Sequence, residues 1–232
     1  MAPHRIDLYD EISLWGWDGQ RFISELRAAA GKDIELHINS PGGDVFEGFT
    51  IANALRAHQG RKVCVIDGLC ASAATFPAAV CDEVVMFDAG FVMVHDPWSV
   101  AVGSAEDLDA HAQLLRKITD QMVALYMRKT KASEEQVRAW VSAETWFSPK
   151  EAKAAGFCDR IADDRAQIDA RAVQRYAARW RNPPPFQVQA KTPAHKPPSP
   201  RGHMDRKQII LTLASALALA HEMATAASSS GD

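Results

Sequence analysis

The stretch Lys62–Val80, which reads KVCVIDGLCASAATFPAAV, organises the predicted fold. Its first half, Val63–Ile66, is a continuous apolar run of mostly β-branched residues and predicts a strand buried on both faces. Gly68 is expected to end that strand, and a run of small, helix-favouring residues begins at Ala71. Ser72 therefore falls at the junction between a strand and a helix.

A serine at such a junction has two interpretations. Its hydroxyl lies beside a helix N-terminus, where the first backbone N–H groups lack partners within the helix and the dipole is positive. Those donors could hold an oxyanion while the hydroxyl of Ser72 attacks a carbonyl. The commoner role of a lone serine here is a helix N-cap or a small packing residue. A catalytic interpretation therefore needs a base from elsewhere in the chain.

The composition is that of a soluble globular domain with additional segments. The chain has 232 residues, 47% hydrophobic and 24% charged, with a net charge of -3. This charge gives no basic footprint for nucleic acid, and no apolar run is long enough to span a bilayer. The cysteines Cys64, Cys70, Cys81 and Cys158 lack metal-ligand spacing, so we expect buried reduced thiols in a cytoplasmic protein. No metal, cofactor or nucleotide-binding motif is predicted.

Residues 1–164 alternate between strand and helix patterns. Strands are expected at 6–12, 34–38, 63–66, 83–87 and 91–94, and helices at 19–30, 45–58, 104–130, from 133, and at 148–156. This alternation predicts an α/β domain with a largely parallel sheet and right-handed crossovers.

The character of the chain changes after residue 164. Residues 165–203 combine a basic helical pattern with a linker that holds seven of the chain's twelve prolines. Such a segment is typical of a semi-extended linker. Residues 204–232 begin with an amphipathic helical pattern that is too short and too interrupted to span a membrane.

His95 is the best candidate for the base that Ser72 would need. It directly follows the apolar strand Phe91–Val94, at the sheet edge where α/β active sites collect. A histidine that merely stabilises its own turn is the alternative. The sharp turn that contains Gly42 and Gly43 could supply a second oxyanion donor and pair with an extended peptide.

Four blocks in the same order resemble one known family. They are INSPGGDVFEGFTIANAL, DGLCASAATFPAAV with Ser72 at its centre, FVMVHDPW and ETWFSPKEAKAAGFCD. The ordered set is similar to the ClpP family of serine peptidases, and most like the ClpP-related prohead proteases of tailed phages. The resemblance covers roughly residues 5–163 and implies a ClpP/crotonase-type fold of stacked β-β-α units. It also implies Ser72 as nucleophile, His95 as general base, and oxyanion amides from Gly42 or Gly43 and from Ala73.

The sequence departs from the family pattern in two places. The third catalytic residue of the family is usually an aspartate, whereas Glu144 stands at that position here, with Asp159 and Asp96 as alternatives. The C-terminal segment has no counterpart in the core of housekeeping members. In the prohead group a scaffold-like segment often follows the protease, which fits residues 204–232.

The resemblance implies a peptidase that acts on phage head proteins, and on its own tail. The alternatives are a crotonase-type acyl-CoA enzyme and a catalytically silent assembly protein. A peptidase with a Ser/Lys dyad is a further alternative, for which Lys117 is the candidate lysine. The resemblance also implies a homo-oligomer of one or two rings. The helix expected at 104–130 is longer than its own sheet requires and would carry the contact, through a stripe that includes Leu108, Leu115 and Met122.

Overall fold

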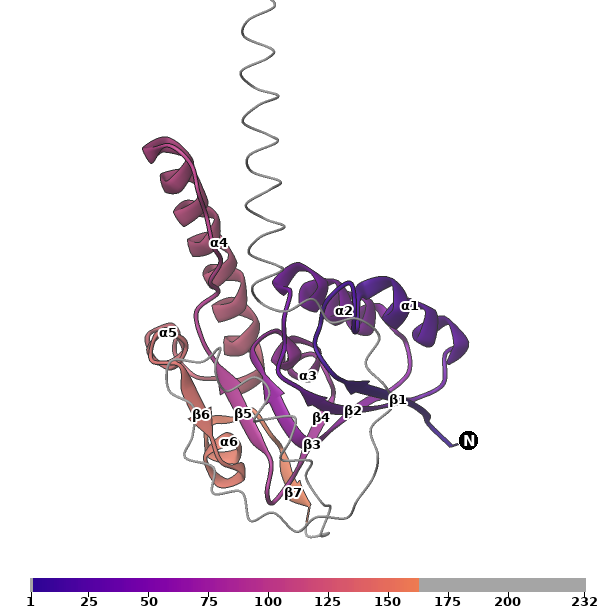
Figure 1. The fold of residues 1–232 in the computed structure, drawn as a ribbon. Helices are drawn as coiled ribbons and strands as arrows, with labels where there is room; N and C mark the ends of the chain where they lie inside the picture. The colour runs from indigo at the N-terminus through magenta and orange to yellow at the C-terminus, as the bar shows by residue number, and fades with distance from the viewer. Residues whose placement is uncertain (1, 163–232) are drawn as a thin grey trace, which may run out of the picture. The chain divides into compact units, whose positions relative to one another are not determined.

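The computed structural model describes residues 2–162 (Figure 1). The elements, in chain order, are β1 (His4–Tyr9), α1 (Gly19–Ala28), β2 (Ile34–Ser40), α2 (Val45–Ala57), β3 (Lys62–Ala71), the short 3-10 helix η1 (Ser72–Ala74), α3 (Thr75–Ala79), β4 (Glu83–Phe87), β5 (Phe91–Val94), α4 (Ala105–Thr130), α5 (Glu134–Ser142), β6 (Thr145–Phe147), α6 (Pro149–Ala155) and β7 (Arg160–Ala162). The predicted α/β fold with a largely parallel sheet is confirmed. The short strands β6 and β7 were not predicted, because three residues are too few to show a period of two.

Strand β3 organises the sheet because it changes partner halfway along its length. The main path runs β1-β2-β3-β4-β7, and β5 pairs with β3 and with β6. The first half of β3 pairs with β4, whereas the residues from Leu69 to Ala71 pair with β5. The prediction that Gly68 ends the strand was wrong. The chain passes through Gly68 and stays in the sheet because β5 supplies new hydrogen-bond partners.

The change of partner coincides with an irregularity between β2 and β3. Ile38 pairs with Ile66 but Ser40 pairs with Cys70, so β3 carries two more residues than β2 over this interval. The side chain of Asn39 fills the gap, since its Oδ1 accepts the backbone N–H of Leu69 at 3.1 Å. This bulge turns the end of β3 toward β5.

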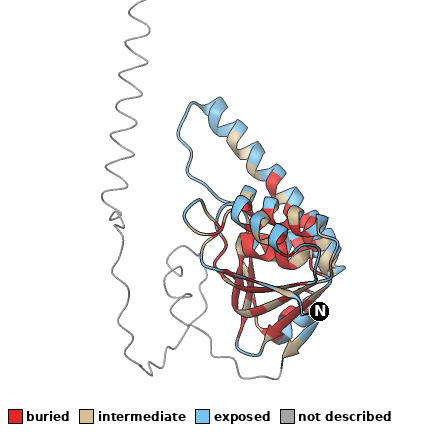
Figure 2. Ribbon diagram, turned by 90° about the vertical axis from the view of Figure 1, so that its right-hand side faces the viewer, coloured by how far each residue is buried: buried red, intermediate tan, exposed pale blue. Residues whose placement is uncertain are grey.

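The core lies between the sheet and the helices α1, α2 and α3, which cover one face (Figures 1 and 2). Alternate residues of β3, among them Cys64 and Ile66, point into this core. Val63 and Val65 point to the other face and are only half-buried. The expectation that Val63–Ile66 is buried on both faces was therefore wrong, and β3 is continuously buried only at its end, from Gly68 to Ala71.

Helix α4 is the longest element of the described chain, and its first half projects from the domain (Figures 1 and 2). Ser104 and Asp107 form the predicted capping box at its start. Its buried residues begin only at Ile118. The predicted length of this helix is confirmed. Met122, which was expected in the contact with a second copy, packs inside its own domain instead, whereas Leu108 is exposed on the projecting half.

Cys64, Cys70, Cys81 and Cys158 are all buried and free, as expected. Within residues 2–162, no helix is both long enough and apolar enough to cross a membrane. The predicted linker at 165–203 and the helical tail at 204–232 lie outside the described residues.

Candidate active site

Ser72 is the first residue of η1, directly after the end of β3. The cap residue of η1 is Ala71, and no side chain caps this helix, so the N-cap interpretation of Ser72 is wrong. The backbone of Ser72 has a φ of 53°, in the left-handed region that residues with a Cβ rarely adopt. Its Oγ instead lies 2.7 Å from Nε2 of His95, within hydrogen-bond distance.

The pairing of β3 with β5 brings these two side chains together. The strands run parallel, with Leu69 opposite Phe91 and Ala71 opposite Met93. Ser72 and His95 follow the ends of these paired strands, so both leave the same edge of the sheet. His95 is 7% exposed, which shields its ring from bulk water.

Glu144 reaches His95 through the antiparallel pairing of β5 with β6. Val94 lies opposite Thr145, so the next pair along this ladder would be His95 and Glu144. The Oε2 of Glu144 is 3.9 Å from Nδ1 of His95, on the opposite side of the ring from Ser72. The Glu144 side chain is 3% exposed and its backbone has a φ of 51°. A short strand that sequence reasoning missed therefore places the predicted acid.

The alternative partners of His95 and Ser72 are engaged or exposed elsewhere. The carboxylate of Asp159 accepts the backbone N–H of Val84 and the ammonium of Lys129, each at 2.7 Å. Asp96 faces Thr119, whose hydroxyl lies 3.4 Å away. Lys117 is exposed on α4. Of the candidate groups, the structure brings Ser72, His95 and Glu144 together.

The two glycines of the predicted turn have different surroundings. The N–H of Gly42 donates to Oγ of Ser40, which uses up that amide. A Cβ on Gly42 would lie 2.5 Å from the carbonyl oxygen of Ala71 and 2.7 Å from the nitrogen of Ala73. Gly42 is therefore needed for close approach to the Ser72 junction. Gly43 and Ala73 remain the better candidates for oxyanion donors.

Ile12, which the sequence pattern placed at the end of the first strand, holds this glycine turn in place. Its N–H donates to the carbonyl of Gly42 at 2.8 Å, and its own carbonyl accepts the N–H of Asp44 at 2.8 Å. These bonds extend the sheet along one side of the turn. The strand expected at 6–12 ends at Tyr9, and Ile12 makes an isolated bridge to Gly43 instead.

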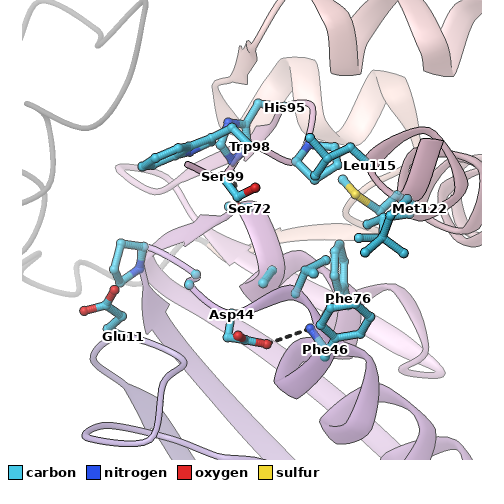
Figure 3. Close-up of a pocket in the computed structure, with 18 of the residues that line it drawn as sticks. Glu11, Asp44, Phe46, Ser72, Phe76, His95, Trp98, Ser99, Leu115 and Met122 are labelled. Carbon is cyan, nitrogen blue, oxygen red and sulfur yellow. Dashed lines mark hydrogen bonds between the residues drawn. The ribbon is translucent and has the colours of Figure 1, made fainter. Parts of the chain in front are cut away.

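A pocket of about 520 Å³ opens beside Ser72 and His95 (Figure 3). Apolar side chains form much of its wall, and they come from α2, α3, α4 and the loop after His95. They include Phe46, Phe76, Trp98, Leu115, Ile118 and Met122. The helical pattern had placed the α4 residues of this set on one stripe, but it could not show that they face a cavity. Such a pocket suits an apolar side chain next to the reacting bond.

A hydroxyl, an imidazole and a buried carboxylate in line, beside backbone amides, form the arrangement of a serine hydrolase. Comparison with known proteins agrees with this class. The family model described as Clp protease matches residues 21–165, and the chain belongs to that family. Nothing in these comparisons is specific to phage prohead proteases, and nothing supports the acyl-CoA alternative.

Two individual proteins are similar to the chain. It is 32% identical over 132 residues to the ATP-dependent Clp protease proteolytic subunit 3 of Streptomyces avermitilis, which covers 56% of this chain. The chain spans 60% of the length of that curated relative. A mutant of ClpP1 from Listeria monocytogenes shares the fold, with a TM-score of 0.63, 22% identity and coverage of 70% of this chain and 92% of the other.

Proposed function

We propose that this protein is a serine endopeptidase that uses Ser72, His95 and Glu144. The observation that supports this most directly is the 2.7 Å contact between Ser72 Oγ and His95 Nε2 at the edge of an apolar pocket. Membership of the Clp protease family supports the same activity.

In the proposed reaction, Ser72 Oγ attacks the carbonyl carbon of the scissile peptide bond, and Nε2 of His95 takes the hydroxyl proton. The buried carboxylate of Glu144 stabilises the imidazolium that forms and holds the ring in the productive orientation. Backbone N–H groups of Gly43 and Ala73 donate to the oxyanion. His95 then gives its proton to the leaving amine as the C–N bond breaks, which leaves an acyl-enzyme on Ser72. Water attacks the acyl-enzyme with His95 again acting as base, and His95 returns that proton to Ser72 Oγ as the carboxylic acid product leaves.

The substrate proposed is an extended polypeptide with an apolar side chain beside the scissile bond. Phe46, Phe76 and Met122 line the pocket that would receive this side chain. In the glycine turn both backbone groups of Gly42 are engaged, by Ser40 and Ile12, so Gly43 is the residue whose backbone would pair with an added strand.

The more specific substrates we propose are phage head and scaffold proteins, and the chain's own tail at 204–232. The four-block resemblance to prohead proteases, together with the segment after residue 164, supports this role. A catalytically silent assembly protein is the alternative, favoured only by the projecting half of α4.

We propose a homo-oligomer in which that projecting half of α4 meets a second copy. Val100 and Val102, in the loop that leads to α4, are 84% and 81% exposed, and Leu108 on α4 is 45% exposed. Exposed apolar residues grouped on a projecting element are typical of a contact surface.

The test is labelling with a fluorophosphonate probe, followed by cleavage assays with a peptide library. Wild-type protein should label once per chain, at Ser72, and should cleave next to large apolar residues. The Ser72→Ala variant should do neither. Equal labelling or cleavage by wild type and Ser72→Ala would contradict the proposal, and absence of both from folded wild type would favour the silent assembly protein.

A further inference from the structure

Two buried hydroxyl groups lie behind the nucleophile, outside the pocket. Thr75 begins α3, is 2% exposed, and donates its hydroxyl hydrogen to the carbonyl oxygen of Ser72 over 2.6 Å. The backbone N–H of Thr75 donates to the same oxygen. The Oγ1 of Thr75 also lies 2.7 Å from the hydroxyl of Tyr126, which is fully buried on α4.

The number of hydroxyl hydrogens available determines which group donates in each of these hydrogen bonds. A carbonyl oxygen only accepts, so the single hydroxyl hydrogen of Thr75 is committed to Ser72. The contact between Thr75 and Tyr126 must then use the hydrogen of Tyr126. Burial raises the pKa of Tyr126, which keeps its hydroxyl protonated and able to donate. Tyr126 therefore donates to Thr75, and Thr75 donates to the carbonyl of Ser72; these two hydrogen bonds are called the relay below.

The relay ends at the peptide group between Ser72 and Ala73, which includes a candidate oxyanion donor. The carbonyl of Ser72 and the N–H of Ala73 belong to one planar peptide unit, so fixing one fixes the direction of the other. Ala73 is a candidate oxyanion donor. Ser72 itself has a left-handed backbone, which persists only where the surroundings hold it. The relay is the side-chain support that this strained junction has from α3 and α4.

We propose that Thr75 and Tyr126 are positioning residues of the peptidase site, which hold the Ser72–Ala73 peptide so that Ala73 N–H points at the oxyanion. The inference rests on the proposed peptidase function. It also ties the nucleophile to α4, because Tyr126 lies one turn after Met122, a residue of the pocket wall. Neither Thr75 nor Tyr126 lines the pocket, so substrate binding should be insensitive to both.

The test compares Thr75→Val, Thr75→Ser, Tyr126→Phe and the double variant Thr75→Val/Tyr126→Phe by kcat, KM and Tm on one peptide substrate. Thr75→Val should lower kcat about tenfold with KM nearly unchanged, the size expected for one hydrogen bond. Thr75→Ser keeps the hydroxyl and should restore kcat. Tyr126→Phe leaves the Thr75 bond in place and should have a smaller effect.

The double variant separates positioning from mere stability. Thr75→Val strands the buried hydroxyl of Tyr126, and Tyr126→Phe removes that hydroxyl, so the double variant should regain Tm over Thr75→Val. If Thr75 and Tyr126 position the Ser72–Ala73 peptide, the kcat of the double variant should stay low. Recovery of kcat together with Tm would overturn the inference, as would wild-type kcat in Thr75→Val. If Thr75→Val fails to fold, the double variant and Tyr126→Phe still decide the question.

Thr130→Val is the matched control, because Thr130 makes the same kind of bond, to the carbonyl of Tyr126, outside the pocket. It should keep the wild-type kcat. Failure of the proposed function would appear separately, as wild-type protein that neither labels at Ser72 nor cleaves peptide.

Discussion

Thr145 of β6 lies opposite Val94 of β5, and this single pairing sets Glu144 beside His95. Glu144 is the turn residue directly before β6, so the register of this ladder places it next to His95. Ser72 and Glu144 both have a positive φ, on either side of His95. Backbone strain of this kind persists only where packing holds it and collects at functional sites.

Replacing Glu144 tests its role as the partner of His95. Glu144→Gln should lower kcat at least about tenfold with little change in KM, since an uncharged amide stabilises the imidazolium less. Steady-state kinetics on a peptide substrate would measure this. Asp159→Asn is the matched control, since Asp159 contacts Lys129 and not the site. If Glu144→Gln kept the wild-type kcat and Asp159→Asn lost it, the role of partner to His95 would pass to Asp159.

The strained backbone of Ser72 predicts a difference between two inactive variants. Ser72→Ala and Ser72→Gly should both lose peptidase activity. Ser72→Gly should be more stable than Ser72→Ala by about 1 kcal/mol, because glycine adopts a positive φ without penalty. Denaturant unfolding of the two proteins would measure the difference. A Ser72→Ala variant as stable as Ser72→Gly would mean that the left-handed backbone is not enforced in solution.

The close approach of Gly42 to the Ser72 junction can be tested against a glycine with free space. Gly42→Ala places a Cβ against backbone atoms at a φ of 82° and should cost about 3 kcal/mol in unfolding free energy, with loss of activity. Gly31 has a similar φ of 79° and nothing within 4 Å. Gly31→Ala should therefore cost only about 1 kcal/mol and stay active. Equal losses in both variants would show that the backbone angle, not the contact, is decisive.

The ring of His37 predicts a pH dependence of stability away from the site. Nδ1 lies 2.7 Å from Asp67 and Nε2 lies 2.9 Å from Glu35. Burial works to lower the pKa of His37, but these hydrogen bonds outweigh it and the pKa rises above its ordinary 6.5. The stabilisation is complete below the unfolded-state pKa and is lost as pH rises through the folded-state pKa.

His37→Gln isolates this contribution. The wild type should exceed His37→Gln in Tm by the largest margin near pH 6, and the margin should shrink toward about pH 9. Thermal melts of both proteins across this range would measure it. A margin independent of pH would indicate that the ring stabilises the fold only in its neutral form.

The projecting half of α4 gives the test of oligomerisation. Leu108→Glu should lower the mass of the assembly in light scattering, because it puts a charge into the proposed contact. Gln113→Glu, at an exposed polar position of the same helix, should not. Met122→Glu is unsuitable for this purpose, since Met122 is 2% exposed and the variant would unfold the domain. Wild-type protein that is monomeric at micromolar concentration would rule out the contact.

Local sequence patterns predict the parts of this protein whose structure depends on a few neighbouring residues. Alternating strands and helices, the caps at Asp18, Ser104 and Ser133, and the glycine turn are local features whose physics acts over a few residues. The ordered blocks around Ser72 and His95 also indicated the family and the candidate nucleophile and base.

Which side chains meet at the candidate site follows only from the folded chain. The change of partner along β3 brings Ser72 to His95, and the β5–β6 ladder places Glu144, not Asp159, beside His95. Thr75 gave no sequence signal, because its hydroxyl contacts Tyr126, which is 51 positions along the chain. Contacts between distant segments are set by sheet register and helix packing, which no local pattern of residues encodes.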